Sequence, residues 1–163
     1  MKKILAISGS TRQNSSNEKL IRLFAAMTAG VFNVTLFEGI AALPHFNPDL
    51  DNEAVPETIK SFRQQIAAAD GVLVCTPEYV FSLPGSLKNA IEWCVSTTLF
   101  AHKPTGLITA SASGEKAQEE LLLIMKTIEA KFTPDTSLLI QGVRGKIDEN
   151  GKVLWIKEFD NTD

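Results

Sequence analysis

Short apolar runs recur along the chain, and longer segments with a different apolar spacing lie between them. The continuous runs cover residues 4–7, 72–75, 107–108 and 138–140. Continuous apolar character over so few residues is typical of strands that are covered on both faces, as in a parallel sheet. The run NVTLFE at residues 33–38 is more alternating, which predicts a strand at or near an edge of that sheet.

The segments between these runs repeat apolar residues every three or four positions, as one face of a helix does. The stripes consist of Leu20, Leu23, Phe24 and Met27; Ile59, Phe62 and Ile66; Leu87, Ala90, Ile91 and Cys94; and Leu121, Ile124, Met125 and Ile128. The second stripe follows Pro56, which suits a first helical turn because the missing proline N–H needs no partner there. The pattern therefore predicts helices between the strands.

Strands that alternate with helices predict right-handed crossovers and a doubly wound α/β fold. Five strands with about four helices match a flavodoxin-like five-stranded parallel sheet with the strand order 2-1-3-4-5. We expect residues 1–163 to form a single domain of this kind. After residue 140 the pattern is less regular. The stretch DENGK contains an Asn-Gly turn signal, and VLWIKEF at residues 153–159 is compatible with an extra strand. A closing helix is not evident in this part of the sequence.

The composition is that of an ordinary globular protein. A chain of 163 residues can bury a core without disulfides or structural metal, and 44% of the residues are hydrophobic and 21% charged. The net charge of −3 argues against nucleic acid as a main partner, because a phosphate backbone requires a basic face.

We expect Cys75 and Cys94 to be buried free thiols. Neither His45 nor His102 lies at a ligand-like spacing from them, so we expect no metal site.

The sequence also gives no sign of a membrane segment. Two lysines precede the apolar residues 4–7, but this run is far shorter than the roughly 7 to 15 apolar residues of a secretion signal. No stretch approaches the roughly 20 apolar residues of a membrane span. We therefore expect a cytoplasmic protein without a membrane partner.

The loops after the first, third and fourth predicted strands carry the unusual chemistry. In the predicted strand order they converge where the order reverses, which is where open α/β sheets bind ligands. The first loop, SGSTRQNSSN at residues 8–17, contains no apolar side chain. Its hydroxyl, amide and backbone N–H groups could surround an anion at the following helix start, and Arg12 would add a fixed charge. Neither a GxxxxGKS/T nor a GxGxxG pattern is present, so the loop best suits a terminal phosphate group.

A helix cap is the simpler alternative for part of this loop. Ser15 and Glu18 have the S-x-x-E spacing of a capping box. Capping does not explain Ser10, Arg12 and Asn17 together, and Ser15 could serve both purposes.

The second loop, TPEYVFSLPGSLKN at residues 76–89, is stiffened by Pro77 and Pro84. A rigid backbone can offer N–H and C=O groups to the edge of a flat polar ring, while Tyr79 and Phe81 offer aromatic surface. Alternatively, these aromatic residues anchor a neighbouring subunit. The two readings are compatible.

The third loop, TASASGEK at residues 109–116, again places small hydroxyl residues and a glycine before a helix. Small side chains permit a planar ligand to approach closely, and Gly114 permits unusual backbone angles. Taken alone, this loop is a weak signal.

With the first two loops in view, the sequence resembles the NADPH-dependent FMN reductase family, which includes quinone, chromate and azo-dye reductases. The family pattern G-S-x-R-x-x-S-x-N is matched by Gly9, Ser10, Arg12, Ser15 and Asn17. The pattern P-E-Y-x-x-S-x-P-G-x-L-K-N-A-I-D-W is matched over residues 77–93, with Glu92 in place of Asp. The resemblance in layout extends from residue 1 to about residue 140.

The resemblance implies non-covalent FMN, with its phosphate on the first loop and its isoalloxazine ring against the second and third loops. The cofactor-binding residues expected on this basis are Ser10, Arg12, Ser15, Ser16, Asn17, Pro77, Glu78, Tyr79, Val80, Ser82, Ser111, Ser113 and Gly114. The resemblance also implies a homodimer, or a tetramer assembled from dimers. In that assembly we expect Leu87 and Trp93 of the third helix to be available for contact.

The sequence departs from the family at three places. Val80 and Phe81 stand where many members carry a smaller or more polar pair such as Asn-Gly, which would reshape the pocket above the flavin. The third loop lacks a glycine-rich run, and the tail replaces a final helix. These departures bear on substrate choice more than on flavin binding.

The activity implied by the resemblance proceeds in alternating half-reactions. NADPH or NADH gives a hydride to flavin N5, and a small acceptor such as a quinone, an azo compound, free flavin or a metal oxyanion is then reduced. We assign no catalytic acid or base, because the resemblance places the backbone of Glu78 toward the flavin.

Three alternatives in other classes share this fold. A flavodoxin-type electron carrier is disfavoured by Arg12 and by the modest net charge. A phospho-receiver domain would need acidic residues after the first strand to hold a divalent cation, and there are none. A redox sensor that binds FMN without useful turnover stays open.

Overall fold

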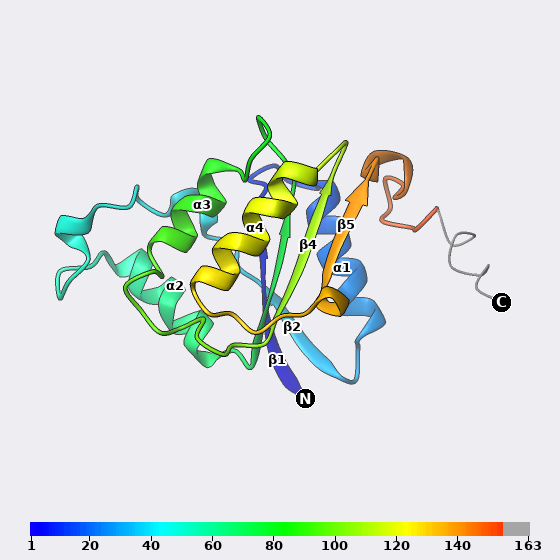
Figure 1. Cartoon of the computed structure of the whole chain (residues 1–163). Coiled ribbons are helices and arrows are strands. Elements are labelled where there is room, and N and C mark those ends of the chain that lie inside the picture. The colour runs from blue at the N-terminus through cyan, green and yellow to red at the C-terminus, as the bar shows by residue number, and fades with distance from the viewer. Residues whose placement is uncertain (155–163) are drawn as a thin grey trace.

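Five parallel strands in the order β2-β1-β3-β4-β5 form the sheet of the computed structural model, which describes residues 1–154 (Figure 1). The strands are β1 (Lys2–Ser8), β2 (Phe32–Leu36), β3 (Gly71–Thr76), β4 (Thr105–Ser111) and β5 (Ser137–Gln141). Every pair of neighbours is parallel. The predicted flavodoxin-like order is therefore confirmed, including the edge position of β2, whose burial alternates along its length.

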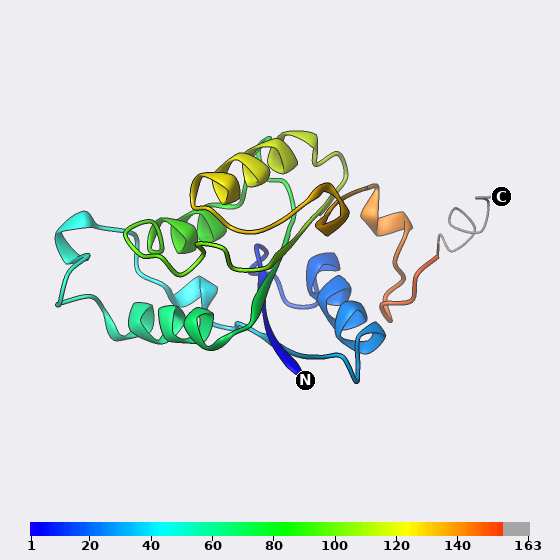
Figure 2. The same cartoon turned by 60° about the horizontal axis from the view of Figure 1, so that its bottom comes forward.

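Helices cover both faces of this sheet (Figure 2). They are α1 (Ser16–Met27), α2 (Glu57–Ala68), α3 (Gly85–Glu92) and α4 (Glu115–Thr127), together with the short 3-10 helices η1 (Ile40–Ala42), η2 (Pro48–Leu50), η3 (Pro134–Thr136) and η4 (Val143–Gly145). The helix α1 packs on one face, and α2, α3 and α4 pack on the other. Within residues 1–154, no helix has both the length and the apolar character needed to span a bilayer.

The core consists of two apolar clusters, one on each face of the sheet. Alternate residues of the central strand β3 point into different clusters: Val72 and Val74 pack under α2 and α3, whereas Leu73 and Cys75 pack toward α1. All residues of β3 are buried. This two-sided burial explains why the strand reads as a continuous apolar run in the sequence.

The buried face of α1 only partly matches the predicted one, since Leu20 is buried and Phe24 packs against the core as expected. Met27 is 77% exposed, so its place in the apolar stripe was wrong. The buried positions are Asn17, Leu20 and Ile21, and Met27 lies at the last residue of the helix. The buried face brings the polar side chain of Asn17 into the cluster beneath the carboxyl ends of β3 and β4.

Leu87 and Trp93 are core residues, and the expectation that they are available to a partner subunit is wrong. Leu87 is 1% exposed and Trp93 is 0% exposed. The Trp93 indole N–H donates to the carbonyl of Pro44 at 2.8 Å, and the indole meets the ring of Phe46 edge-on with a centroid distance of 5.0 Å. The amide side chain of Asn89 also holds this segment, by bonding both Pro44 and Phe46. These residues of the second motif fasten the 44–46 segment to α3.

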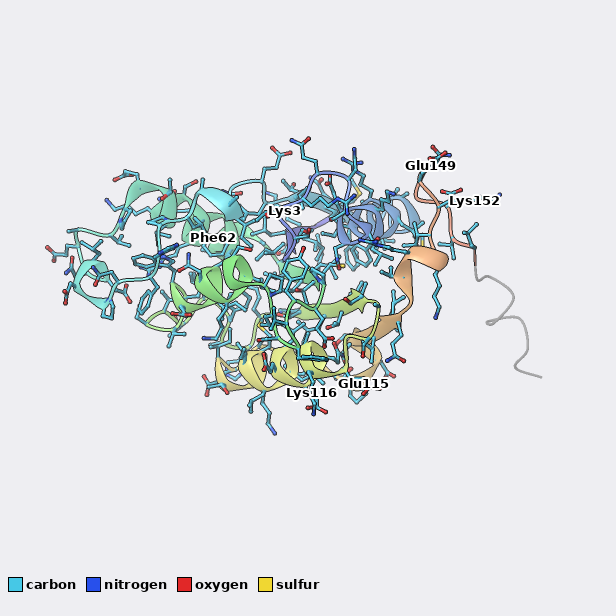
Figure 3. All side chains as sticks on the ribbon, turned by 90° about the horizontal axis from the view of Figure 1, so that it is seen from above. Lys3, Phe62, Glu115, Lys116, Glu149 and Lys152 are labelled. Carbon is cyan, nitrogen blue, oxygen red and sulfur yellow. The ribbon has the colours of Figure 1, made fainter. Side chains whose placement is uncertain are left out.

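The segment after β5 forms a compact turn beside α1. Ile147 pairs with Val153 in an antiparallel bridge, and the Asp148 carboxylate accepts the backbone N–H groups of Asn150 and Lys152. Between residues 142 and 154 no α-helix forms. Most of the extra strand expected at residues 153–159 lies outside the described residues. Figure 3 shows Glu149 and Lys152 at the periphery of the molecule on this segment.

Candidate functional site

A cavity of about 510 Å³ opens at the carboxyl edge of the sheet, where loops from four strands meet. Its lining residues are Ser10, Arg12, Ser15, Ser16, Asn17, Pro77, Glu78, Tyr79, Ala110, Ser111, Ala112, Gly142, Val143, Arg144 and Gly145. The loops after β1, β3 and β4 therefore converge as predicted. The fourth wall, formed by residues 142–145 after β5, was not predicted.

Most of the expected site residues line this cavity, and four of them do not. The residues found in its wall are Ser10, Arg12, Ser15, Ser16, Asn17, Pro77, Glu78, Tyr79 and Ser111. The expected residues Val80, Ser82, Ser113 and Gly114 lie outside the lining. The side chain of Ser82 is directed away from the cavity, because its hydroxyl donates to the Glu120 carboxylate of α4 at 2.5 Å. Gly114 instead starts α4 with a positive φ of 86°.

Gly9 allows the loop after β1 to pass close to β3. Its backbone N–H donates to the Cys75 carbonyl at 2.8 Å, which continues the strand pairing into the loop. A Cβ atom at Gly9 would lie 2.4 Å from the Thr76 hydroxyl oxygen and 2.9 Å from the Thr76 Cβ. Only glycine fits this approach, so the small residue of the first motif sets the position of Ser10 at the cavity edge.

The start of α1 presents an electropositive corner to the cavity. Ser15 caps the helix, because its hydroxyl accepts the Glu18 N–H at 3.1 Å. The second half of the predicted capping box does not form, since the Glu18 carboxylate accepts the N–H of Asn14 instead. Arg12 is exposed, and its guanidinium has no hydrogen-bond or ion-pair partner within residues 1–154. A helix N-terminus beside an unpaired cation is a favourable environment for an anion.

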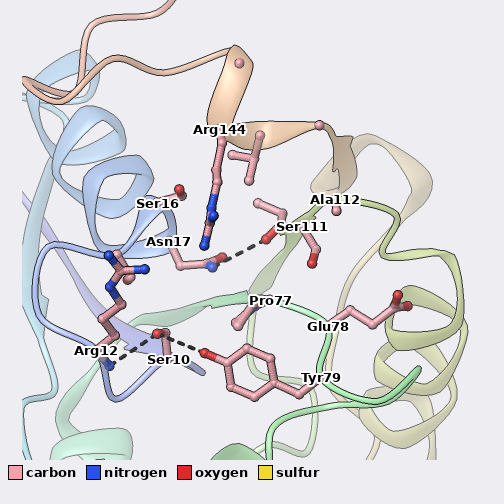
Figure 4. Close-up of a pocket in the computed structure, with 15 residues that line it drawn as sticks. Ser10, Arg12, Ser16, Asn17, Pro77, Glu78, Tyr79, Ser111, Ala112 and Arg144 are labelled. Atoms are coloured by element: carbon pink, nitrogen blue, oxygen red, sulfur yellow. Dashed lines mark hydrogen bonds between the residues drawn. The ribbon is translucent and has the colours of Figure 1, made fainter.

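Asn17 supports this corner from below. It is 3% exposed, its side-chain amide donates to the Ala110 carbonyl at 3.4 Å, and its amide oxygen accepts the Cys75 thiol at 3.1 Å. These bonds tie the first turn of α1 to β3 and β4. In Figure 4 the labelled side chain of Asn17 forms one of the dashed bonds. Asn17 therefore holds the cavity floor together and is not free to grip a ligand with both ends of its amide.

The two cysteines are buried free thiols, as predicted. Burial raises the pKa of the Cys75 thiol far above its usual range and raises the pKa of Cys94 to about 12. Both groups are thiols at neutral pH, so neither has the thiolate that a cysteine nucleophile needs.

Glu78 turns its carboxylate away from the cavity (Figure 4). The two carboxylate oxygens accept the backbone N–H groups of Gly114 at 3.2 Å and Ala117 at 3.0 Å. Gly114 has no side chain to cap α4, so Glu78 caps this helix from the neighbouring loop. The backbone of Glu78 remains in the cavity wall, and its carboxylate fixes the loop after β3 to the loop after β4.

Tyr79 closes the side of the cavity between the first two loops. Its hydroxyl lies 3.5 Å from the Ser10 hydroxyl, and the residue is 49% exposed (Figure 4). The ring therefore offers a partly exposed aromatic surface next to Pro77.

A two-residue hairpin turn follows Tyr79, and its residues Val80 and Phe81 are not part of the cavity lining. Tyr79 and Ser82 exchange backbone hydrogen bonds of 3.0 Å each, and Val80 and Phe81 between them have φ values of 52° and 59°. This is the geometry of a type I′ turn, which favours Asn-Gly. Val80 is 95% exposed and Phe81 is 73% exposed, so packing does not compensate for the unfavourable backbone.

Replacing the turn by Asn-Gly is expected to stabilise the fold. The double variant Val80→Asn/Phe81→Gly removes a β-branched and an aromatic residue from positive φ, and we expect a gain of about 1 kcal/mol in the free energy of unfolding. Urea unfolding at constant m-value measures the change. Val95→Asn is the control, because Val95 is 62% exposed but does not have a positive φ. An equal gain in the control would show that backbone strain is not the cause.

Arg144 is the charged residue of the cavity lining that the sequence did not reveal. It lies in η4 and lines the cavity, and Figure 4 shows its side chain directed toward Asn17 and the start of α1. The only available signal was its position between Gly142 and Gly145 directly after a strand, in QGVRG. That stretch lacks the hydroxyl residues that marked the other three loops.

Comparisons with known proteins agree with this geometry. A family model described as NADPH-dependent FMN reductase matches residues 2–144. A 2-hydroxy-1,4-benzoquinone reductase of a Burkholderia species is 32% identical over 158 residues, which cover 93% of this chain and 85% of that protein. A quinone reductase of Escherichia coli strain K12 is 30% identical over 158 residues, with coverages of 93% and 84%. Among solved structures, the flavoenzyme NAD(P)H:(acceptor) oxidoreductase FerB from Paracoccus denitrificans matches 98% of this chain and 90% of that chain, with a TM-score of 0.82 and 27% identity.

Proposed function

The chain belongs to the NADPH-dependent FMN reductase family, and from this membership we propose that its cavity holds FMN and that it reduces a quinone at the expense of NAD(P)H. The protein is an NAD(P)H-dependent oxidoreductase with FMN as its cofactor. The observation that carries the site assignment is the cavity itself, in which the residues of both family motifs meet.

The cavity suits FMN in size and in chemistry. Its volume of about 510 Å³ lies within the range of about 300–1,000 Å³ typical of ligand sites. One end offers Arg12, the hydroxyls of Ser10 and Ser16, and the start of α1, which together suit a phosphate. The other end offers backbone, aromatic surface and small side chains between Pro77 and Ala112, which suit a flat ring.

Bound FMN would supply the redox chemistry, by accepting a hydride from NAD(P)H and passing two electrons to the acceptor. The residues of the chain position the cofactor and shape the space above it. Among the lining residues of the described chain, Glu78 is the only carboxylate, and it is engaged by the N-terminus of α4. Tyr79 borders the cavity with a partly exposed ring, and we propose that it contacts the acceptor. We assign no side chain as a catalytic acid or base.

The acceptor class is drawn from the relatives. Both relatives described above are named for quinones, the Burkholderia protein as a 2-hydroxy-1,4-benzoquinone reductase and the Escherichia coli protein as a quinone reductase. We infer that a quinone of similar size is the acceptor here. Azo compounds, free flavin and metal oxyanions are the further candidates to compare with it.

An absorption spectrum followed by an anaerobic titration tests the proposed function. Purified protein incubated with FMN is expected to retain the visible bands of an oxidised flavin after desalting. NADPH should bleach these bands, and a quinone should restore them over many cycles. Retention without turnover would indicate a sensor, and single-electron exchange without NADPH oxidation would indicate a carrier. Protein that retains no flavin would overturn the assignment.

We also propose that the protein is a cytoplasmic homodimer, with a tetramer assembled from two dimers as the alternative. The exposed apolar surface of Tyr79, Val80 and Phe81, on the hairpin next to the cavity wall, supports association at this edge. Light scattering on the FMN-loaded protein decides the assembly, and a flavin-loaded monomer would contradict the proposal.

A further inference from the structure

Two guanidinium groups from distant parts of the chain approach the same end of the cavity. Arg12 comes from the loop after β1, and Arg144 comes from η4 after β5. In Figure 4 both side chains extend toward the first turn of α1, where Ser16 and Asn17 lie. Arg144 is exposed and has no hydrogen-bond or ion-pair partner in the described part of the chain. The two guanidinium groups thus bring like charges to one end of the cavity, and neither forms an ion pair with a carboxylate of residues 1–154.

The turn that carries Arg144 is firmly anchored. The N–H of Gly142 donates to the Ala112 carbonyl at 3.1 Å, which joins the loop after β5 to the loop after β4. Gly142 has a positive φ of 61°, and the following Val143 is 4% exposed in the apolar cluster beneath α1. On the other side, Ile147 is 6% exposed in the same cluster. Arg144 thus stands on a short turn that is fixed on both sides by buried apolar residues.

The charge of a phosphate monoester explains why two cations would be held here. Such a group carries about −1.5 to −2 charges at neutral pH. Arg12 neutralises one charge, and the N-terminus of α1 contributes the equivalent of about half a charge. A second guanidinium balances the remainder and can form paired hydrogen bonds with phosphate oxygens. The one carboxylate among the described lining residues, that of Glu78, is bonded to the start of α4 and lies away from this end.

From this arrangement, which rests on the proposed function, we propose that Arg144 binds the FMN phosphate together with Arg12. The phosphate is then enclosed between the loop after β1 and the turn after β5. Arg144 is a cofactor-binding residue in this assignment and takes no part in electron transfer. The family motifs do not include it, since both of them end before residue 94.

Parallel titrations with FMN and riboflavin test this assignment, because riboflavin has the same ring and ribityl chain without the phosphate. For Arg144→Ala we expect FMN to bind about tenfold more weakly or worse, as for the loss of a charge-assisted contact. Riboflavin affinity should stay within about twofold of the parent. Arg144→Lys should recover part of the FMN affinity, because lysine retains the charge but loses the paired geometry.

Lys152→Ala is the matched control, since it removes one positive charge from the same segment but lies outside the cavity lining (Figure 3). We expect it to leave FMN affinity unchanged, and circular dichroism should show the same fold for every variant. Equal losses for FMN and riboflavin in Arg144→Ala would place Arg144 against the ring and overturn the proposal. Unchanged FMN affinity would overturn it as well. If the parent protein binds neither flavin, the proposed function fails before the role of Arg144 is reached.

Discussion

Trp93→Ala is expected to lower the free energy of unfolding by about 3–5 kcal/mol, as for a large aromatic residue removed from a packed core. Trp93 is 0% exposed and bonds the Pro44 carbonyl through its indole N–H. Its own carbonyl accepts two hydrogen bonds from Arg63, at 2.9 and 2.6 Å. The variant would leave a cavity beneath α3 and release the 44–46 segment. Urea denaturation measures the loss, provided that the variant still folds at low temperature.

Trp93→Phe separates the two contributions of this side chain. Most of the apolar volume remains, but the Pro44 carbonyl loses its indole donor and keeps only the bond from Asn89. We expect a smaller loss of about 1–2 kcal/mol. An interface role would give a different result: Trp93→Ala would then reduce the assembly size while leaving the stability of the subunit largely unchanged.

Arg12→Ala is expected to weaken FMN binding by about 1.5–3 kcal/mol, which corresponds to a dissociation constant roughly tenfold to more than a hundredfold higher. Arg12 is exposed at the cavity wall and bonds no carboxylate within residues 1–154, so the fold does not depend on its charge. Quenching of FMN fluorescence on titration with protein measures the change. The unfolding midpoint of the flavin-free variant should match that of the parent.

Arg22→Ala provides the comparison for this variant. Arg22 lies in the middle of α1, pairs with Glu18 of the first turn and does not line the cavity. Its removal changes the net charge by the same amount and should alter FMN affinity by less than about threefold. If Arg12→Ala retains FMN as tightly as the parent, then the phosphate does not lie in this loop.

The sheet and its strand order were predictable because strands that are buried on both faces have continuous apolar sequences. Strand β3 is buried at every residue and its sequence is a nearly continuous apolar run, whereas burial alternates along the edge strand β2. The position of the cavity followed from the strand order, because the loops at a reversal point must converge. The buried residues of the helices were harder to predict. An apolar stripe on α1 does not specify its end, so Met27 was assigned to the core although it lies at the final residue of the helix.

The direction of side chains within the site was not predictable from motif spacing. Ser82 belongs to the same continuous motif as Glu78, yet its side chain bonds to Glu120 of α4 and leaves the cavity. For Glu78 only the resemblance, and not the spacing, implied that the backbone faces the cavity, and the carboxylate indeed bonds the start of α4. For the same reason, Leu87 and Trp93 were expected at a surface: spacing identifies an apolar face but not what covers it. Arg144 was missed because the turn after β5 carries no polar cluster, and only the folded chain brings it beside the loop after β1.

The walls of the cavity come from residues between Ser10 and Gly145, almost the full described length of the chain. A nascent polypeptide whose strand β5 is still inside the ribosome can therefore offer a cofactor only three of the four walls of this cavity. FMN binding is then a late step in the folding of this protein. It follows formation of the hydrogen bond from Gly142 to Ala112, which joins the loop after β5 to the loop after β4. Once captured, the cofactor shifts the folding equilibrium by mass action, so that cellular FMN supply would govern how much of this protein survives quality control.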